Sequence, residues 1–443
     1  MTASPSAARS QVRTAFRVTG PIADLSTADR RMLFDRGPTA DEHVRDRTAE
    51  IIRRVRQDGD RALRELARTF DGATLDQLEV PPAVWHEAAA TVGSAVRTAL
   101  ERAAGNIRRA HEAWRPAGGE VETEPGVFVG RRADPLARVG VYAPGGRALY
   151  PSSVLMGAVP ARVAGVGEVV MCSPPGASGT PAPIVLAAAE IADVDRVFAI
   201  GGAGAVAALA YGTESVPRVD RIVGPGNAYV TAAKLEVASV VGIDAPAGPS
   251  ELLIVADDSA AAEAVAREVL AQAEHDPDAA VIVIATDPAT AGAIGQAVQC
   301  LIPFEQRAGI IAASLAARGA LLVAASMTDA VHFANDWAPE HLLLAVADPS
   351  AILGEIRNAG TICLGVTTSV VFGDYLTGAN HVLPTGGAAR RFSGLSTEDF
   401  VRWTTYQRVT DSAARSLARD VATLATAERL PAHAAAARQW ATR

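Results

Sequence analysis

From Arg138 onward, short apolar runs alternate with alanine-rich stretches of helical spacing, and this rhythm limits the fold more than any other feature of the sequence. RVGVYAP, EVVMCSP and RVFAIGG read as strands, and each precedes a longer segment with a helical pattern. A second set begins at Glu251 with ELLIVAD and continues through AVIVIAT, ALLVAAS, HLLLAV and TICLG. Strands that alternate with helices form parallel sheets, so the sequence predicts two α/β domains. Ligands of such domains bind beyond the carboxyl ends of the strands, and we expect a crevice there in each domain.

The segments on either side of this pattern have a different character. Residues 1–20 carry no clear periodicity, whereas Leu25 to about Gly118 has the spacing of amphipathic helices, one of which ends at Gly72. VETEPGVFVGRRADPLARV predicts a hairpin followed by an extended stretch. From about Ser396 the chain predicts a helical appendage or dimer arm that is polar on one side.

Length and composition narrow the class of protein further. Of 443 residues, 49% are hydrophobic, so we expect two or three domains and little disorder. A net charge of −8 argues against binding to nucleic acids or anionic membranes. The first residues lack an apolar signal and no run has membrane-spanning length, which predicts a cytoplasmic protein. The three cysteines cannot form a disulfide framework, and we expect inert buried thiols at Cys172, Cys300 and Cys363.

Glycine-rich turns follow several of the predicted strands. APGG at 143–146, GPGN at 224–227 and AGPSE at 247–251 could each bring backbone N–H groups to a ligand, or could be ordinary turns. Residues 202–207, GAGAVA, match the fingerprint of dinucleotide-binding turns. The match is weak, because Asp220, the candidate acid for the ribose, precedes a strand instead of ending one. Lys234 is the only lysine, so any lysine chemistry would have to use it.

Four histidines lie in polar segments that could gather around a metal ion. AQAEHD places Gln272 and His275 three residues apart on a predicted helix, so that both project from one face. Three or four such donors would suit zinc, manganese or iron, and the alternative is that His275 and His433 simply lie on helix surfaces. GDYLTGANH, APEHL and ERLPAH supply the other candidate groups, namely Asp374, His381, Glu340, His341, Glu428 and His433.

Glu340 and His341 form a different kind of pair, at the start of a strand-like run. Adjacent residues cannot share one helical face, but both can reach a cleft from an irregular segment. An imidazole is the usual proton acceptor near neutral pH, and a neighbouring carboxylate can raise its pKa or transfer a second proton. The pair therefore predicts a proton-transfer site, with an ion-paired loop as the alternative.

Taken together, these motifs point to one family. VGVYAPGG, YPSSVLMGAVPARVAGV, VDRIVGPGNAYVTAAK, VGIDAPAGPSELLIVAD, AQAEHDPDA, APEHLLL, GDYLTGANHVLPTGGAAR and ERLPAH occur in one order and spacing. In these strings the chain resembles the histidinol dehydrogenase family, from about Ser26 to its end. The resemblance implies two Rossmann-like parallel-sheet domains with small helical N- and C-terminal segments. The implied boundaries are a tail at 1–36, a discontinuous catalytic domain at 37–141 and 251–395, an inserted NAD-binding domain at 142–250, and a dimer arm at 396–443.

The resemblance also implies roles for individual residues. Glu340 and His341 match the family's proton-transfer pair. Tyr142 and Asn227 match contacts to NAD, and Gly204 stands where the family usually has a glutamine that contacts NAD. Substrate contacts are implied for Ser250, His381 and Glu428, and also for His341 and the four metal ligands. One zinc ion per subunit is implied, with ligands Gln272, His275, Asp374 and His433.

In this family the last of these ligands comes from the second subunit, so the resemblance implies a homodimer with shared active sites. The implied reaction is a four-electron oxidation of L-histidinol to L-histidine through bound histidinal, with two NAD molecules used in turn. His341 would take the hydroxyl proton, and Glu340 would activate water to hydrate the aldehyde. The alternatives are a paralogue that oxidises a different alcohol or amino alcohol, a zinc hydrolase with Glu340 as base, and a two-domain solute-binding protein.

Overall fold

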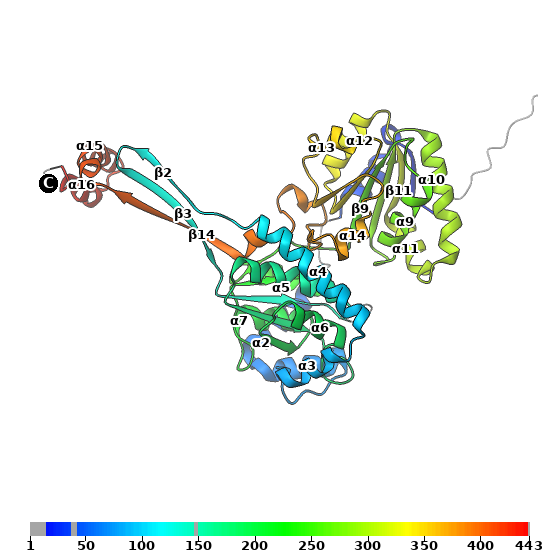
Figure 1. Cartoon of the computed structure of the whole chain (residues 1–443), viewed down its shortest axis with the longest axis horizontal. Helices are drawn as coiled ribbons and strands as arrows, with labels where there is room; N and C mark the ends of the chain where they lie inside the picture. The colour runs from blue at the N-terminus through cyan, green and yellow to red at the C-terminus, as the bar shows by residue number, and fades with distance from the viewer. Residues whose placement is uncertain (1–14, 37–41, 146–148, 442–443) are drawn as a thin grey trace, which may run out of the picture.

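The computed structural model describes residues 15–36, 42–145 and 149–441. Two parallel sheets, each covered by helices, form two α/β domains, and a long arm extends from one of them (Figure 1). The predicted fold class, with two Rossmann-like parallel-sheet domains, is confirmed. Among the helices of the described residues, none is long and apolar enough to cross a membrane.

The first domain is built on a six-stranded sheet whose described strands are all parallel. Its strands alternate apolar side chains between two helical layers, so both faces are buried. In spatial order they are β1 (Val18–Pro21), β11 (Gly319–Val323), β10 (Ala280–Ala285), β9 (Glu251–Ala256), β12 (His341–Ala345) and β13 (Thr361–Leu364). One face packs against α9 (Ala262–Ala273), α10 (Pro288–Leu301) and α11 (Ala308–Arg318). The other packs against α1 (Thr27–Phe34) and α12 (Met327–Trp337). Shorter helices α13 (Pro349–Leu353) and α14 (Val370–Tyr375) follow.

The second domain is built on a five-stranded parallel sheet. Its strands, in spatial order, are β6 (Arg196–Ala199), β5 (Glu168–Ser173), β4 (Arg138–Tyr142), β7 (Arg221–Val223) and β8 (Gly242–Ile243). The connecting helices are α5 (Pro151–Ala164), α6 (Pro183–Ile191), α7 (Gly202–Tyr211) and α8 (Ala228–Val237). Three further helices, α2 (Glu42–Leu66), α3 (Pro82–Ala90) and α4 (Ser94–Ala113), pack on α7 and α8, on α6 and on α5 respectively.

This packing corrects the predicted domain boundaries. Residues 42–113 share a hydrophobic core with the five-stranded sheet, not with residues 251–395. Polar contacts support that assignment, because Asp60 of α2 accepts a 2.6 Å hydrogen bond from the Thr213 hydroxyl. The N-terminal segment is also not a separate tail, because β1 extends the six-stranded sheet through β11. An amphipathic helix pattern shows that one face is buried, but the sheet that it covers is set by apolar partners far away in the chain.

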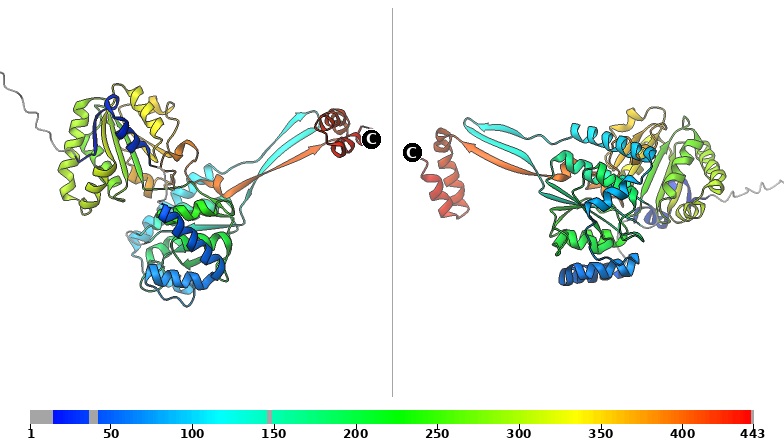
Figure 2. Two further views of the ribbon diagram at one scale, coloured as in Figure 1. Left: turned by 180° about the vertical axis from the view of Figure 1, so that it is seen from behind. Right: turned by 60° about the horizontal axis from the view of Figure 1, so that its bottom comes forward.

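The arm is a three-stranded antiparallel ribbon that ends in two helices (Figures 1 and 2). It consists of β2 (Gly119–Glu124), β3 (Val127–Pro135) and β14 (Val401–Val409), followed by α15 (Asp411–Ala427) and α16 (Pro431–Arg438). The hairpin of β2 and β3 was predicted, but the C-terminal segment starts with a strand, not a helix. Ribbon and helices leave large apolar side chains exposed, including Trp403, Tyr406 and Leu424.

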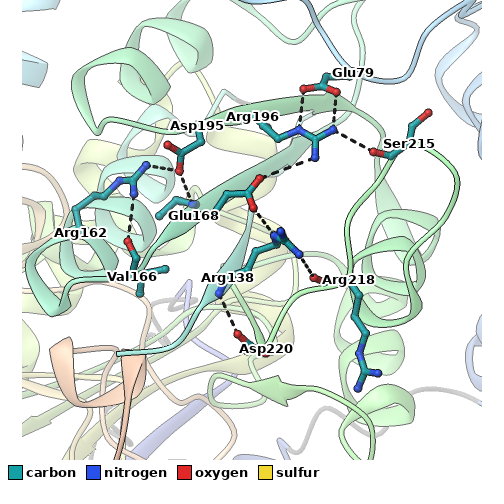
Figure 3. Close-up of polar contacts among 11 residues, drawn as sticks. Glu79, Arg138, Arg162, Val166, Glu168, Asp195, Arg196, Ser215, Arg218 and Asp220 are labelled. Carbon is teal, nitrogen blue, oxygen red and sulfur yellow. Dashed lines mark hydrogen bonds and ion pairs between the residues drawn. The ribbon is translucent and has the colours of Figure 1, made fainter. Parts of the chain in front are cut away.

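Ion pairs occupy the amino ends of the strands in the five-stranded sheet (Figure 3). Arg138, at the start of β4, pairs with Glu168 at the start of β5, with 2.5 Å between Nε and Oε2. Arg196, at the start of β6, pairs with Glu79 at 2.6 Å. The charged side chains at the amino ends of these strands thus pair with one another. A ligand is expected at the carboxyl ends instead.

Candidate active site

The proton-transfer pair lies at the amino end of a strand in the six-stranded sheet. His341 is the first residue of β12 and Glu340 directly precedes it, and both side chains are buried. The candidate pair thus lies at the end of the sheet opposite to the carboxyl ends, where a crevice was expected. The amino ends of β9 and β12 lie beside the segment 374–385, which contacts the second domain. The side-chain amide of Asn380, for example, donates to the Met156 carbonyl at 2.8 Å.

His341 is held by three acceptor groups. Nδ1 donates to the carbonyl of Glu251 at 3.1 Å and lies 3.5 Å from Glu340 Oε2, while Nε2 lies 3.4 Å from Asp374 Oδ1. Burial opposes a charged imidazole, but the carboxylates of Glu340 and Asp374 outweigh it and hold the pKa of His341 well above its usual value. Burial also acts on Asp374, where the hydrogen bond and charge of His341 prevail and lower the pKa of the carboxyl. This geometry suits a group that takes up and returns a proton.

His381 belongs to the same cluster, and its hydrogen bonds indicate a neutral ring. Nδ1 donates to the backbone carbonyl of Asp374 at 2.8 Å, and Nε2 lies 3.3 Å from the hydroxyl of Ser153. Burial lowers the pKa of His381, so the neutral form prevails at neutral pH. Ser153 comes from α5 of the second domain, and the sequence carried no signal for it because its position depends on how the domains meet.

Gln272 and His275, the candidate metal ligands predicted on one helical face, do not both lie in the helix. Gln272 lies on the last turn of α9, but the helix ends at Ala273 and His275 follows it. His275 Nδ1 donates to the Gln272 carbonyl at 3.2 Å, which leaves Nε2 available. The buried side chain of Gln272 has an amide Nε2 with no hydrogen-bond partner among the described residues. A buried amide nitrogen without a partner is costly, and a bound molecule with a hydrogen-bond acceptor at this point would satisfy it.

The remaining predicted residues lie apart from one another. Ser250 precedes β9, beside Glu251. Glu428 and His433 are on the arm, at the end of α15 and in α16, far from the cluster within one chain (Figure 1). Within the described part of the chain, no three His, Cys, Asp or Glu side chains gather in an arrangement that could hold a metal. One subunit thus brings together Gln272, His275 and Asp374 at most, and His433 could join them only from another subunit.

A cavity of about 730 Å³ opens at the carboxyl ends of the five-stranded sheet, where a crevice was predicted. Tyr142, Gly204 and Asn227, the three predicted cofactor residues, all line it. Asn227 caps α8, because its side-chain oxygen accepts from the N–H groups of Tyr229 and Val230 at 3.0 and 3.2 Å. Its amide nitrogen therefore remains free to donate to a ligand.

Gly204 contributes to this cavity through helix packing. A Cβ atom at this position would lie 2.9 Å from Leu66 Cδ1 and 3.4 Å from Leu63 Cδ2, both on α2. The glycine therefore allows α7 and α2 to approach closely, which fits the view that the fingerprint at 202–207 is accidental. Sequence reasoning missed Asp71, which also lines the cavity and whose pKa is raised to about 6 by burial.

Neither the lysine nor the cysteines are arranged for chemistry. Lys234 is buried, pairs with Asp244 and donates to the Gly224 carbonyl at 3.0 Å, so it supports the turn that carries Asn227. Cys172 and Cys363 are buried as predicted, and burial raises the pKa of each thiol, to about 12 for Cys363. Cys300 is exposed, contrary to the prediction.

A buried Glu–His pair in one α/β domain and a large cavity in the other form an arrangement that a two-domain α/β oxidoreductase could use. The family pattern described as histidinol dehydrogenase matches residues 34–440. Histidinol dehydrogenase of Methanosarcina barkeri is 45% identical over 420 residues, covering 94% of this chain and 96% of the relative. That of Halobacterium salinarum is 48% identical over 415 residues, covering 94% and 97%. The crystal structure of histidinol dehydrogenase from Elizabethkingia anophelis matches with a TM-score of 0.92 at 33% identity, over 97% of this chain and 98% of that one. The chain belongs to the histidinol dehydrogenase family.

Proposed function

We propose that the protein catalyses the zinc-dependent, NAD-linked, four-electron oxidation of L-histidinol to L-histidine through bound histidinal, the last step of histidine biosynthesis. The observation that carries the proposal is the position of His341, with Nδ1 fixed by a backbone carbonyl and Nε2 beside Asp374. Membership of the family supports histidinol as the substrate. The side chains of Glu340, His341, Asp374 and His381 support the presence of a base where the two domains meet.

The residues present fit a zinc ion. Gln272 offers its side-chain carbonyl oxygen, His275 has a free Nε2, and Asp374 is a carboxylate whose ionised form is favoured. Together with His433 of a second subunit they would make the N/O donor set that zinc accepts. When bound, the ion would hold nitrogen atoms of the substrate, orient its carbinol carbon and offset the charge of Asp374.

The cavity beside Tyr142 and Asn227 fits the nicotinamide nucleotide in size and in hydrogen-bonding groups. When bound there, NAD would supply the acceptor for the hydride that leaves the substrate carbon. His341 Nε2 takes the proton of the substrate hydroxyl, while the Glu251 carbonyl keeps the Nδ1–H in place. Glu340 then removes a proton from a water molecule that adds to the aldehyde, and His341 returns its proton to the aldehyde oxygen. The neutral imidazole can then take the hydroxyl proton of the hydrate in the second oxidation.

We propose in addition that the active form is a homodimer in which the arm of one subunit reaches the site of the other. The arm supports this proposal because its exposed apolar side chains, such as Trp403, Leu424 and Trp440, would be buried by a partner. It also carries Glu428 and His433, which lie too far from their own subunit's cluster to act there.

The experiment that tests the function is a spectrophotometric assay of purified protein with zinc, NAD and L-histidinol. We expect reduced nicotinamide to form at two molecules per molecule of histidinol, with histidine as the product. No reduction with histidinol but turnover of another alcohol would favour a paralogue with a different substrate. Activity without any nucleotide reduction would favour the hydrolase and contradict the proposal.

A further inference from the structure

One residue outside the predicted site, Glu251, contacts both members of the proton-transfer pair through its backbone. Its N–H donates to Glu340 Oε2 at 2.6 Å, and its carbonyl accepts from His341 Nδ1 at 3.1 Å. A carbonyl can only accept, so it requires hydrogen on Nδ1. In the neutral ring this leaves the lone pair on Nε2, the atom that faces Asp374.

The side chain of Glu251 is itself fixed on both sides. Oε1 accepts from the backbone N–H of Gly386 at 2.8 Å, and Oε2 lies 2.5 Å from Arg36 Nη1. This ion pair is buried, with 4% and 3% of the two side chains exposed. Oε1 is thus hydrogen-bonded, and Oε2 is held by the charge of Arg36 without hydrogen-bond geometry. Glu251 therefore does not compete with Glu340 for the substrate.

Arg36 connects the carboxylate of Glu251 to the segment that precedes β12. Its Nη2 donates to the carbonyl of Trp337, and its guanidinium lies 3.6 Å from the centre of the Trp337 ring. Trp337 ends α12, only three residues before Glu340, and Ala338 after it has a left-handed φ of 51°. One guanidinium therefore joins the start of β9 to the turn that leads into β12, and these are neighbouring strands.

Stability alone is a poor reason for this arrangement. A buried ion pair loses its hydration, and well-packed apolar residues of similar volume are often at least as stable. Burial raises the pKa of the Glu251 carboxyl, and the Arg36 guanidinium opposes that rise. The contacts of the pair lead to the two backbone positions from which Glu340 and His341 extend.

We propose that Arg36 and Glu251 are positioning residues that fix the tautomer of His341 and the orientation of Glu340. The inference rests on the proposed function for the roles of Glu340 and His341, and on the described contacts for everything else. Neither residue touches the substrate in this scheme. Their loss should consequently slow proton transfer and leave the binding of histidinol and NAD almost unchanged.

The test compares four proteins. The double variant Arg36→Met/Glu251→Gln removes both charges with little change in volume, and Arg36→Lys keeps the charge but loses the planar fork. As a control for the loss of an Arg–Glu pair as such, Arg196→Met/Glu79→Gln removes a part-exposed pair at the amino ends of the strands in the second domain (Figure 3). We expect kcat to fall about tenfold or more in the double variant and about threefold in Arg36→Lys, with both KM values within about twofold. The control should keep the kcat of the natural chain.

A second measurement separates this inference from the proposed function. Ring nitrogen NMR signals of histidine, with those of His341 assigned by their loss in His341→Asn, report which nitrogen carries hydrogen whether or not histidinol is the substrate. In spectra recorded at a pH high enough to remove the charge of the imidazolium, we expect the Nδ1–H form in the natural chain and a mixture of tautomers in the double variant. If the double variant does not fold, Arg36→Lys carries the same comparison. An unchanged kcat together with unchanged His341 signals would overturn the proposal.

Discussion

The hydroxyl of Tyr142 accepts a 3.0 Å hydrogen bond from the backbone N–H of Gly202, the first residue of α7. Tyr142 ends β4 at the edge of the cavity, so the phenol covers the N-terminus of the helix there. Burial raises the pKa of Tyr142 to about 12, and the hydroxyl therefore keeps its proton at neutral pH. It is left with a hydrogen to donate to whatever fills the cavity.

Replacing Tyr142 with phenylalanine removes the acceptor for the Gly202 N–H and the hydroxyl hydrogen that would be donated to NAD. We expect KM for NAD to rise roughly fivefold to tenfold, kcat to change little, and the free energy of unfolding to fall by about 1 kcal/mol because the Gly202 N–H loses its partner. Initial-rate kinetics and thermal unfolding measure these effects. Tyr211→Phe, at the other end of α7, is the matched control and should leave KM unchanged. An unaltered KM in Tyr142→Phe would remove Tyr142 from the cofactor site.

Restoring the family's glutamine at position 204 should not by itself restore a cofactor contact. The new side chain would collide with Leu66, whose Cδ1 would lie 2.9 Å from the added Cβ. We expect Gly204→Gln to weaken NADH binding several-fold, and Gly204→Gln/Leu66→Ala to regain the natural affinity or exceed it. Fluorescence titration with NADH measures both. Tighter binding in the single variant would mean that Leu66 moves aside at little cost.

Glutamine in place of Glu340 should separate the two halves of the reaction. The amide cannot take a proton from water, but it can still accept the hydrogen bond from the Glu251 N–H. We expect oxidation of the aldehyde to slow at least about tenfold more than oxidation of the alcohol. The rates of NADH formation from histidinol and from histidinal, measured separately, give the ratio. Equal losses with the two substrates would contradict the role of Glu340 in water activation.

The sequence predicted the alternation of strands and helices better than it predicted the site. Alternation of apolar runs is visible locally, so the parallel sheets and the crevice beside Tyr142 could be anticipated. The sequence placed Glu340 and His341 at the start of a strand, but it could not show that this end of the strand lies beside the second domain, because that depends on how the two domains meet. Arg36 and Glu251 were missed for a related reason, since their contacts involve backbone atoms and join residues far apart in the chain. Residue types give no signal for such contacts.

Asp71 should make the stability depend on pH. Its pKa is 3.8 in an unfolded chain and about 6 in the folded protein, so the folded state binds the proton more tightly. This stabilisation is complete below the unfolded pKa and is lost as the pH rises through about 6. Because the carboxyl borders an open cavity, solvent reduces the effect to on the order of 1 kcal/mol. We expect Asp71→Asn to gain stability relative to the natural chain between about pH 4 and pH 7, as measured by thermal unfolding at each pH. A difference that does not vary with pH would contradict the raised pKa.

The shared site can be tested by combining two inactive subunits. His341→Asn removes the base of a subunit's own cluster, and His433→Ala removes the donor that its arm would deliver to the partner. Each variant alone should lose about a hundredfold or more of the activity. In a mixed dimer, one site would contain both defects and the other would contain neither.

Random assembly of equal amounts makes half of the dimers mixed, each with one intact site, so about a quarter of the natural activity should return. Co-expression of the two variants, followed by the histidinol assay, measures this recovery. The control is a mixture of His341→Asn with Glu340→Gln, because both defects lie in the same cluster and no intact pair of catalytic residues can form. If the first mixture stayed as inactive as this control, His433 would not act across subunits, and the arm would need another explanation for its exposed apolar side chains.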